Sequence, residues 1–412
     1  MQEVDEVTQG AETPSAPQGR SVRVGHLSVL ALGHGVNDGL ANAIAPIWPM
    51  VRQQFGLTMS GIGLITFWWG LTTNFSQPLF GYLIDRWNPR RILGVATLVA
   101  TVFFCTVGYT RNLTWFVAFL VLGGLGVSVY HPRAGALAVK VSGGRKALGM
   151  GVFTAGGSVG MAAGYLLSPY LCELVGSTKG LLYAAPAGIL TAVLLWGTGS
   201  RDSRQSADQG FDFRQDVLPH LGKLLPLALV MILRASTVVA FCNFLPLLLA
   251  AQGRQLVAGG YSGFFFTAGG AIGSMIGGHI SDRLGRRGIT IVSMLLSPAC
   301  VYFALQSTQR PGLACLFLAL FTLGMVLRAA EAVNITHTQE LLPRATSLAS
   351  SLGMGFAWGF AGLVAPLLGF LADRHGVDYA LGWVIWLPLV AGLVAFGIPR
   401  TTGSAKSASE TA

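Results

Sequence analysis

The segment Gly277-Gly278-His279-Ile280-Ser281-Asp282-Arg283-Leu284-Gly285-Arg286-Arg287 lies between two apolar runs and decides the fold. A looser copy, Gly81-Tyr82-Leu83-Ile84-Asp85-Arg86-Trp87-Asn88-Pro89-Arg90-Arg91, stands 197 residues earlier. Each copy closes the second apolar run of its own half of the chain, and a third run follows at once. This repeat indicates that a unit of about 200 residues was duplicated. We therefore expect two related halves.

Composition places both halves in a lipid bilayer. Of the 412 residues, 52% are hydrophobic and 11% are charged, whereas about 25% are charged in a typical soluble domain. Apolar runs long enough to cross a hydrocarbon core of about 30 Å predict an all-α protein with twelve transmembrane helices. The runs cover residues 26–49, 60–84, 92–110, 113–139, 147–175, 180–199, 221–250, 258–281, 289–308, 312–338, 345–371 and 378–398.

The distribution of charge predicts the topology. The formal net charge is +10, which by itself would suit a nucleic-acid partner. With the N-terminus in the cytoplasm, however, 17 basic residues fall in cytoplasmic segments and 6 on the opposite side. This bias predicts cytoplasmic termini in a bacterial inner membrane and argues against nucleic acid. The predicted units are a tail (1–20), a six-helix bundle (21–199), a linker (200–220), a second bundle (221–400) and a tail (401–412).

The five cysteines all fall in apolar runs and show no C-x-x-C spacing. Buried small side chains of this kind do not indicate disulfides or metal ligands. We expect no metal, no cofactor and a monomer.

The first apolar run carries a polar face. His34, Asp38 and Asn42 are four residues apart, so they share one face of a helix. A carboxylate at the centre of a membrane helix costs about 2.5–3.5 kcal/mol on insertion scales, so its presence needs a reason. Either Asp38 forms a hydrogen bond between helices, or it is a protonatable site facing a watery cavity. We interpret Asp38 and His34 as proton-coupling residues.

The second half carries cations instead. Aligning Pro246 with Pro46 places Arg234 opposite His34, and Arg328, Glu331 and Asn334 follow at three-residue spacing on a later run. Arg328 and Glu331 either neutralise each other within the helix, or Arg328 binds an anionic substrate and Glu331 takes part in proton coupling. Three further residues could either bind substrate or serve another role. Arg133 could form part of a cytoplasmic gate, and Asn74 and Gln77 could make polar contacts between helices. The predicted substrate-binding residues are Asn37, Asn42, Asn74, Gln77, His131, Arg133, Arg234, Asn243, Arg328 and Asn334.

Glycines recur every four residues in two runs. The fifth has Gly156, Gly160 and Gly164, and the eighth has a matching set at residues 269, 273 and 277. Small residues at this spacing let helices touch backbone to backbone.

The duplicated segment resembles the loop motif between helices 2 and 3, and again between helices 8 and 9, of the major facilitator superfamily. This resemblance implies two pseudo-symmetric six-helix bundles around a central cavity that opens alternately to each side. It also implies gating residues, which we expect to hold the cytoplasmic side shut in the outward-facing state. These are Asp85, Arg86, Asp282, Arg283, Arg286 and Arg287.

Further motifs resemble the fosmidomycin-resistance branch of that superfamily, whose members are similar to drug exporters. They are His34-x-x-Asn37-Asp38, Tyr130-His131-Pro132, Ser142-Gly143-Gly144-Arg145 and Leu233-Arg234.

These residues together predict a proton-coupled antiporter that exports a small anionic or zwitterionic compound or drug. Intramembrane arginines outnumber the acidic residues, which favours an anionic cargo. Proton-coupled uptake of a metabolite and export of a siderophore or other natural metabolite are the alternatives. An enzyme is not expected, because no Ser/His/Asp group or metal-spaced His/Cys group is visible. A sensor or scaffold that does not transport is not expected either, because intramembrane charges would then bring no benefit to offset the free-energy cost of inserting them.

Overall fold

The computed structural model describes residues 22–87, 91–143, 146–198, 214, 217–342 and 355–400, without the side chains of residues 85–87, 146–148, 282 and 284. All regular structure in these ranges is helical. Among the described residues, eight helices are long and apolar enough to cross a membrane, which confirms an all-α, multi-pass membrane protein. They span Ile92–Tyr109, Leu113–Val141, Gly149–Val175, Thr178–Trp196, Leu218–Ala251, Arg286–Thr308, Ala314–Leu341 and Val377–Gly397.

Apart from the first run, the helices before residue 199 follow the predicted runs closely. They are α1 (Val24–Asn42), η1 (Ala45–Ile47), α2 (Trp48–Phe55), α3 (Met59–Trp87), α4 (Ile92–Thr106), η2 (Val107–Tyr109), α5 (Leu113–Val141), α6 (Lys146–Val175), η3 (Thr178–Ala184) and α7 (Ala185–Trp196).

The helices after residue 216 form the second set. They are η4 (Leu218–His220), α9 (Leu221–Ala251), α10 (Leu256–Leu284), α11 (Arg286–Thr308), α12 (Ala314–Leu341), α14 (Ala357–Ala361), α15 (Val364–His375), α16 (Val377–Gly382), η6 (Trp383–Ile385), α17 (Trp386–Val394) and η7 (Ala395–Gly397).

The first predicted run is not one continuous helix. Helix α1 ends at Asn42, and Pro46 and Pro49 stand in the first turns of η1 and α2. Proline has no backbone N–H and disfavours helical geometry in the residue before it, so it interrupts a helix here. The break leaves Asp38 in the last turn but one of α1, and α2 begins six residues after α1 ends.

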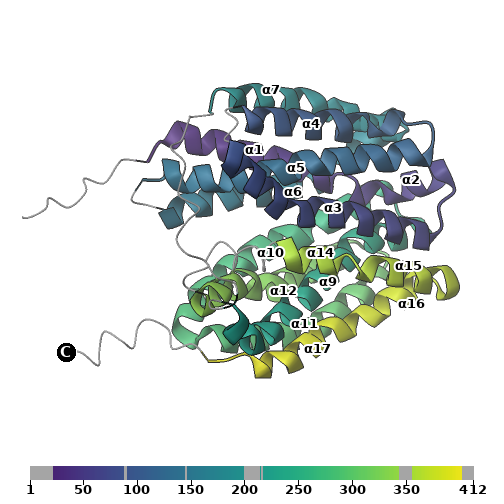
Figure 1. Cartoon of the computed structure of the whole chain (residues 1–412). Helices are drawn as coiled ribbons and strands as arrows, with labels where there is room; N and C mark the ends of the chain where they lie inside the picture. The colour runs from purple at the N-terminus through teal and green to yellow at the C-terminus, as the bar shows by residue number, and fades with distance from the viewer. Residues whose placement is uncertain are drawn as a thin grey trace, which may run out of the picture.

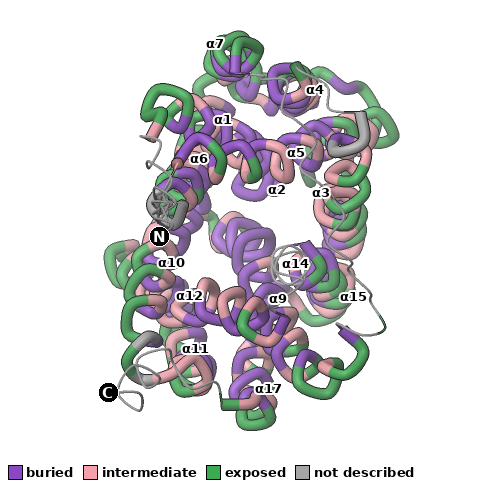
Figure 2. Tube along the Cα trace, turned by 60° about the vertical axis from the view of Figure 1, so that its left-hand side comes forward, coloured by how far each residue is buried: buried purple, intermediate pink, exposed green. Residues whose placement is uncertain are grey.

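The two sets of helices lie in two groups. Figure 1 shows α1 to α7 above and α9 to α17 below, with most helices running along the same long direction. Figure 2 shows exposed residues on the peripheral sides of helices such as α7 and α17, while buried residues face into each group. The predicted tails and most of the predicted linker lie outside the described residues.

Glycine stripes bring particular helices into backbone contact. A Cβ atom on Gly160 of α6 would lie 1.8 Å from the carbonyl oxygen of Gly35 in α1, and one on Gly164 would lie 2.2 Å from that of Gly39. In the second half, the glycine at 273 of α10 meets the Met325 carbonyl of α12 in the same way. The two stripes therefore pack on α1 and on α12, each within its own half.

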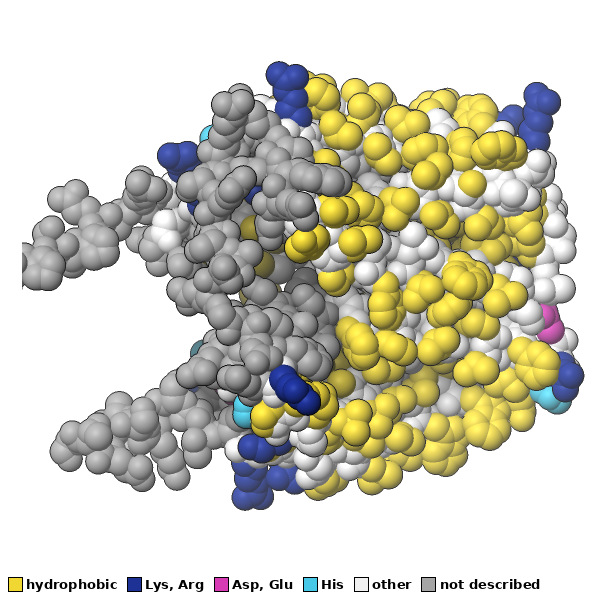
Figure 3. Space-filling view, viewed as in Figure 1, with side chains coloured by type: hydrophobic (Ala, Val, Ile, Leu, Met, Phe, Trp, Pro, Cys, Tyr) yellow, Lys and Arg dark blue, Asp and Glu magenta, His cyan; other side chains and the backbone are white. Residues whose placement is uncertain are grey.

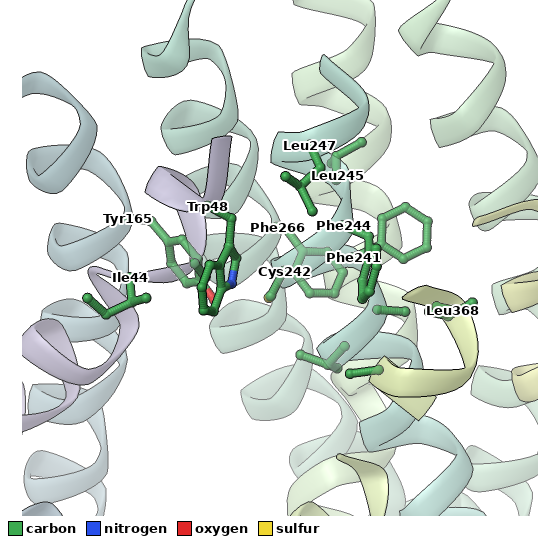
Figure 4. Close-up of a cluster of buried hydrophobic side chains, with 14 of the residues drawn as sticks. Ile44, Trp48, Tyr165, Phe241, Cys242, Phe244, Leu245, Leu247, Phe266 and Leu368 are labelled. Atoms are coloured by element: carbon green, nitrogen blue, oxygen red, sulfur yellow. The ribbon is translucent and has the colours of Figure 1, made fainter. Parts of the chain in front are cut away.

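The two groups touch through α6 with α10 and through α3 with α15. The ring of Tyr165 in α6 fills the space above Gly263 in α10, and the Gly63 position in α3 meets the backbone of Ala365 in α15. Between them, Trp48 of α2 donates to the side chain of Asn243 in α9 at 2.9 Å. Figure 4 shows Trp48 and Tyr165 beside each other, facing apolar residues of α9 and α10.

The outer surface is apolar over most of its length. Figure 3 shows hydrophobic side chains across the middle of the visible face, with Lys and Arg side chains at its two ends. Val159, Leu225 and Met275 are each 70% or more exposed. A wide apolar band between charged ends is the surface expected of a protein in a bilayer.

Candidate functional site

Asp38 is held between two histidines. Its Oδ2 atom lies 3.2 Å from Nε2 of His34, one turn earlier on α1, and its Oδ1 atom lies 3.1 Å from Nε2 of His131 on α5. The side chain of Asp38 is 15% exposed and that of His131 is 18% exposed. We call His34, Asp38 and His131 the first-half cluster. It is almost enclosed by helices, but it still has access to solvent.

The outer nitrogens of both histidine rings are anchored to the backbone. Nδ1 of His34 lies 2.8 Å from the carbonyl oxygen of Phe153 on α6, and Nδ1 of His131 lies 2.9 Å from that of Val127 on α5. The Phe153 ring also stacks on His34, with centroids 4.2 Å apart. Each imidazole is therefore oriented so that its Nε2 atom faces the same carboxylate.

Gly157 of α6 makes room for this arrangement. A Cβ atom at Gly157 would lie 2.6 Å from Nε2 of His34 and 2.8 Å from Oδ2 of Asp38. The neighbouring contacts of α6 with α1 through Gly156 and Gly160 bring the helix this close. Glycine is thus required at position 157 by the side chains of the site, whereas Gly156 and Gly160 serve the backbone contact between the helices.

Three charged residues form a second group. Glu331 of α12 lies between two arginines: its Oε2 atom is 2.7 Å from Nε of Arg328, and its Oε1 atom is 3.3 Å from Nη2 of Arg234 on α9. A Cβ atom on Gly270 of α10 would lie 2.4 Å from Cδ of Arg328. We call Arg234, Arg328 and Glu331 the second-half cluster. Its formal charge is +1, so Glu331 does not neutralise it.

Arg234 has hydrogen-bonding capacity left over. It is 1% exposed, and its Nε and Nη1 atoms have no hydrogen-bond partner among the described residues. The guanidinium lies 6.0 Å from the centre of the Trp358 ring. A buried guanidinium with unused donors is costly unless a ligand or water satisfies them, so this cluster suits an anionic group.

Two side chains, those of Asn42 and Tyr165, lie between the two clusters and are joined by a hydrogen bond. Asn42 donates to the backbone carbonyl of Asp38 at 2.9 Å and accepts from the hydroxyl of Tyr165 at 3.3 Å. Tyr165 in turn lies beside Cys242 of α9 and within electrostatic reach of Arg328 (Figure 4). Asn42 and Tyr165 thus extend hydrogen bonds from the backbone of Asp38 toward the second-half cluster, at the place where the halves meet.

Several predicted substrate-binding residues occupy other surroundings. Asn37 is fully buried and donates to Thr97 of α4 and to the carbonyl of Gly33. Asn334 is also fully buried and accepts from Thr290 of α11. Asn74 and Gln77 donate to backbone carbonyls one turn earlier in α3. Arg133 is partly buried on α5.

Of the predicted gating residues, the side chains of Asp85, Arg86 and Asp282 lie outside the described residues. Arg283 is exposed. Arg286 lies 3.3 Å from Glu340 of α12, and Arg287 donates to the carbonyl of Phe396. Both of these contacts stay within the second half.

Sequence reasoning missed several of these residues. Nothing in the linear pattern distinguishes Tyr165, Trp48 or Trp358 from other aromatic residues in apolar runs. Gly157 was visible only as the neighbour of a stripe glycine. Thr97 is one of four threonines in its apolar run, so its polarity alone does not single it out.

The first-half cluster also offers donor types used by metals, with one ligand atom from each side chain and all of these within 4.8 Å of one another. The Nε2 to oxygen distances of 3.1 and 3.2 Å are those of hydrogen bonds. We therefore interpret the cluster as a place where protons are shared.

Comparison with known proteins places this chain in a family. Residues 30–366 match the family model described as Major Facilitator Superfamily. The chain is 27% identical over 387 residues to the fosmidomycin resistance protein of Escherichia coli (strain K12), covering 90% of this chain and 92% of that protein. It is 20% identical over 404 residues to the multi-drug resistance efflux pump PmrA of Streptococcus pneumoniae, covering 90% and 96%.

Solved structures of other transporters have a similar fold. A bacterial homologue of the human lysosomal transporter Spinster, in an inward-facing and unoccupied conformation, has a TM-score of 0.71 at 17% identity, covering 92% of this chain and 98% of that one. A D-xylose-proton symporter has a TM-score of 0.74 at 14% identity, covering 93% and 100%. Because the family model covers most of the chain and the helical fold agrees, this protein belongs to the Major Facilitator Superfamily of transporters.

Proposed function

We propose that this protein is a secondary active transporter that exports a small anionic or zwitterionic compound in exchange for protons. The observation that carries this proposal is the pairing of two unlike clusters, one in each half. The first-half cluster joins a carboxylate to two imidazoles, the side-chain type whose ordinary charge change lies nearest to neutral pH, whereas the guanidinium groups of the second-half cluster stay charged. A proton and an anion thus have separate places in one molecule.

The free-energy cost of placing charged side chains inside the membrane supports a role for them in transport. A charged side chain within a membrane helix costs about 2.5–3.5 kcal/mol on insertion scales, and such residues mark ion and substrate pathways. Asp38 and Glu331 lie on helices of different halves and are 15% and 14% exposed, so both remain accessible to a ligand.

Alternating access fits the way the halves meet. The described helices and the family support twelve transmembrane helices in two pseudo-symmetric bundles. The α3 to α15 contact and the start of α10 lie at the end of the molecule away from the start of α1 and the end of η7. With cytoplasmic termini in a bacterial inner membrane, this conformation is closed on the outer side. Rocking of one bundle on the other would then expose the clusters to the outside.

Export is favoured by the membrane potential. One elementary charge crossing about 100 mV is worth about 2.3 kcal/mol, and an anion leaving a negative cytoplasm moves with that field. Proton entry supplies a second driving force. The relatives named for drug resistance and efflux support the same direction.

A flux assay separates export by antiport from proton-coupled uptake. Purified protein is placed in vesicles that hold a pH-sensitive dye, and fosmidomycin is added outside as the probe. Antiport predicts that the lumen becomes more alkaline as the probe enters, whereas symport predicts acidification. Overexpression should also raise the fosmidomycin concentration that stops growth. Acidification in the vesicles would overturn the proposed exchange.

A further inference from the structure

We propose that the first-half cluster carries two exchangeable protons, one in each contact between a histidine Nε2 atom and Asp38, and that His131 is a proton carrier equal to His34. This inference rests on the proposed function and extends it, because it sets the number of protons in the cycle.

The backbone fixes which nitrogen of each ring carries a hydrogen. A carbonyl oxygen only accepts hydrogen bonds, so Nδ1 of His34 must donate to Phe153, and Nδ1 of His131 must donate to Val127, at 2.8 and 2.9 Å. A neutral imidazole has one N–H group. Both histidines, when neutral, therefore have a bare lone pair at Nε2.

A bare Nε2 atom cannot make a hydrogen bond to a carboxylate. Nitrogen and oxygen would then face each other with lone pairs at 3.2 Å for His34 and 3.1 Å for His131. Each contact becomes attractive only when a proton lies in it, on the nitrogen or on the oxygen. Two such contacts to the two oxygens of Asp38 require two protons.

The charge of the cluster follows from this count. With two protons, the two imidazoliums and one carboxylate sum to +1. Loss of one proton leaves the cluster neutral with one unfavourable contact, and loss of the second leaves a lone carboxylate at −1. A change of two charges in a nearly buried site is a strong electrostatic signal to an anion bound nearby.

Among the side chains that the structure describes, the ion-pair contacts of Asp38 are those with His34 and His131. From α5, Tyr130 lies next to His131, but its hydroxyl donates to the carbonyl of Leu30. Arg133 is two residues from His131 and so points to a different side of α5. Helices α4 and α7 contain no charged residues, and α6 has them only at its ends, as Lys146 and Glu173.

Nitrogen NMR tests the proton count directly, without a substrate. The protein is labelled with ¹⁵N-histidine in lipid nanodiscs, and the signals are assigned with His34→Gln and His131→Gln. As the pH rises, both residues should lose the Nε2 hydrogen in two separate steps and keep the Nδ1 hydrogen. The exposed His26, replaced in a His26→Gln control, should leave both signals unchanged. A neutral form of either residue with hydrogen on Nε2 would overturn the inference.

Transport then tests whether both protons move. With the membrane potential clamped at zero and fosmidomycin as the probe, net flux should vanish when one pH unit is balanced by about a hundredfold probe gradient, since each proton contributes about tenfold. In His131→Gln the balance should fall to about tenfold. A tenfold balance in the unmodified protein would contradict the two-proton count while leaving antiport intact. Flux that ignores pH altogether would instead contradict the proposed function.

Discussion

The carboxylate of Asp373 caps the first turn of α3 across the interface between the halves. Its oxygens accept from the backbone N–H groups of Met59, at 2.7 Å, and Ser60, at 2.9 Å, and also from the Ser60 hydroxyl. The first half caps a helix of the second half in the same way. Glu173 at the end of α6 accepts a hydrogen bond from the backbone N–H group of Val257, in the first turn of α10, at 3.2 Å. Each half therefore caps a helix of the other with a carboxylate.

Replacing Asp373 by Ala should favour the form that is open at this end. Loss of a helix cap costs about 0.5–2 kcal/mol, so the open population should rise several-fold. Spin labels at Gln53 and Ala251, which line the groove between α2 and α9, report the separation of the halves. Asp378→Ala, at the same end of the molecule, is the matched control and should leave the distances unchanged. An unchanged distribution in Asp373→Ala would rule out a role for the cap in closure.

Acid should weaken the same contact. Burial acts to raise the pKa of Asp373, but the hydrogen bonds from Ser60 and Met59 outweigh it and hold the pKa below its usual value. A carboxyl whose pKa is lowered in the closed form stabilises that form fully above its ordinary pKa and loses this effect as the pH falls through the lowered value. The spin-label distances should therefore widen only in strongly acidic buffer, and Asp373→Ala should remove that widening.

Gly157→Ala should stop transport without unfolding the protein. The added methyl group would lie 2.6 Å from Nε2 of His34, so the first-half cluster must shift. Flux should fall by at least about tenfold, as for other small displacements of a working group. Gly151→Ala is the control on the same helix, because its Cβ atom would meet nothing within 4 Å. Normal flux in Gly157→Ala would show that the cluster tolerates displacement.

Removing either arginine of the second-half cluster should weaken anion binding. Arg328→Ala or Arg234→Ala should reduce the affinity for fosmidomycin by about 1.5–3 kcal/mol, the range for a hydrogen bond to a charged group. Lysine should restore part of the loss, since it keeps the charge but lacks the planar fork. Isothermal titration of detergent-purified protein gives the affinities, and the exposed Arg283→Ala is the control. Unchanged binding in both alanine variants would leave Arg328 and Glu331 as an internal ion pair.

The helices were largely predictable from sequence, whereas the site was predictable only in part. Apolar length alone indicates where α5 or α9 begins and ends, because each must cross the same hydrocarbon layer. The spacing of His34 and Asp38 on one helix likewise predicts their contact. The partner from another helix is different: His131 was expected to bind substrate, and only the folded chain shows it beside Asp38, 93 positions away in sequence.

The same limit applies to packing. A stripe of glycines shows that a helix has a close neighbour but does not say which one, so the contact of Gly160 with α1 could not be derived from its spacing. Asn37 illustrates a further difficulty. A polar residue next to Asp38 in sequence looks like part of the site, but the turn of the helix points it to Thr97 on α4.

The central claim is that protons taken up in the first-half cluster, and held there by the carboxylate of Asp38, drive the export of an anion. The most direct test compares Asp38→Asn with the unmodified protein in vesicles, using fosmidomycin and an imposed pH difference. Asparagine keeps the size and hydrogen bonding of the side chain but cannot titrate. The variant should build no gradient of the probe, yet it should still exchange labelled for unlabelled probe when no pH difference is present. A probe gradient formed by Asp38→Asn from the pH difference alone would contradict the claim and direct attention to Glu331.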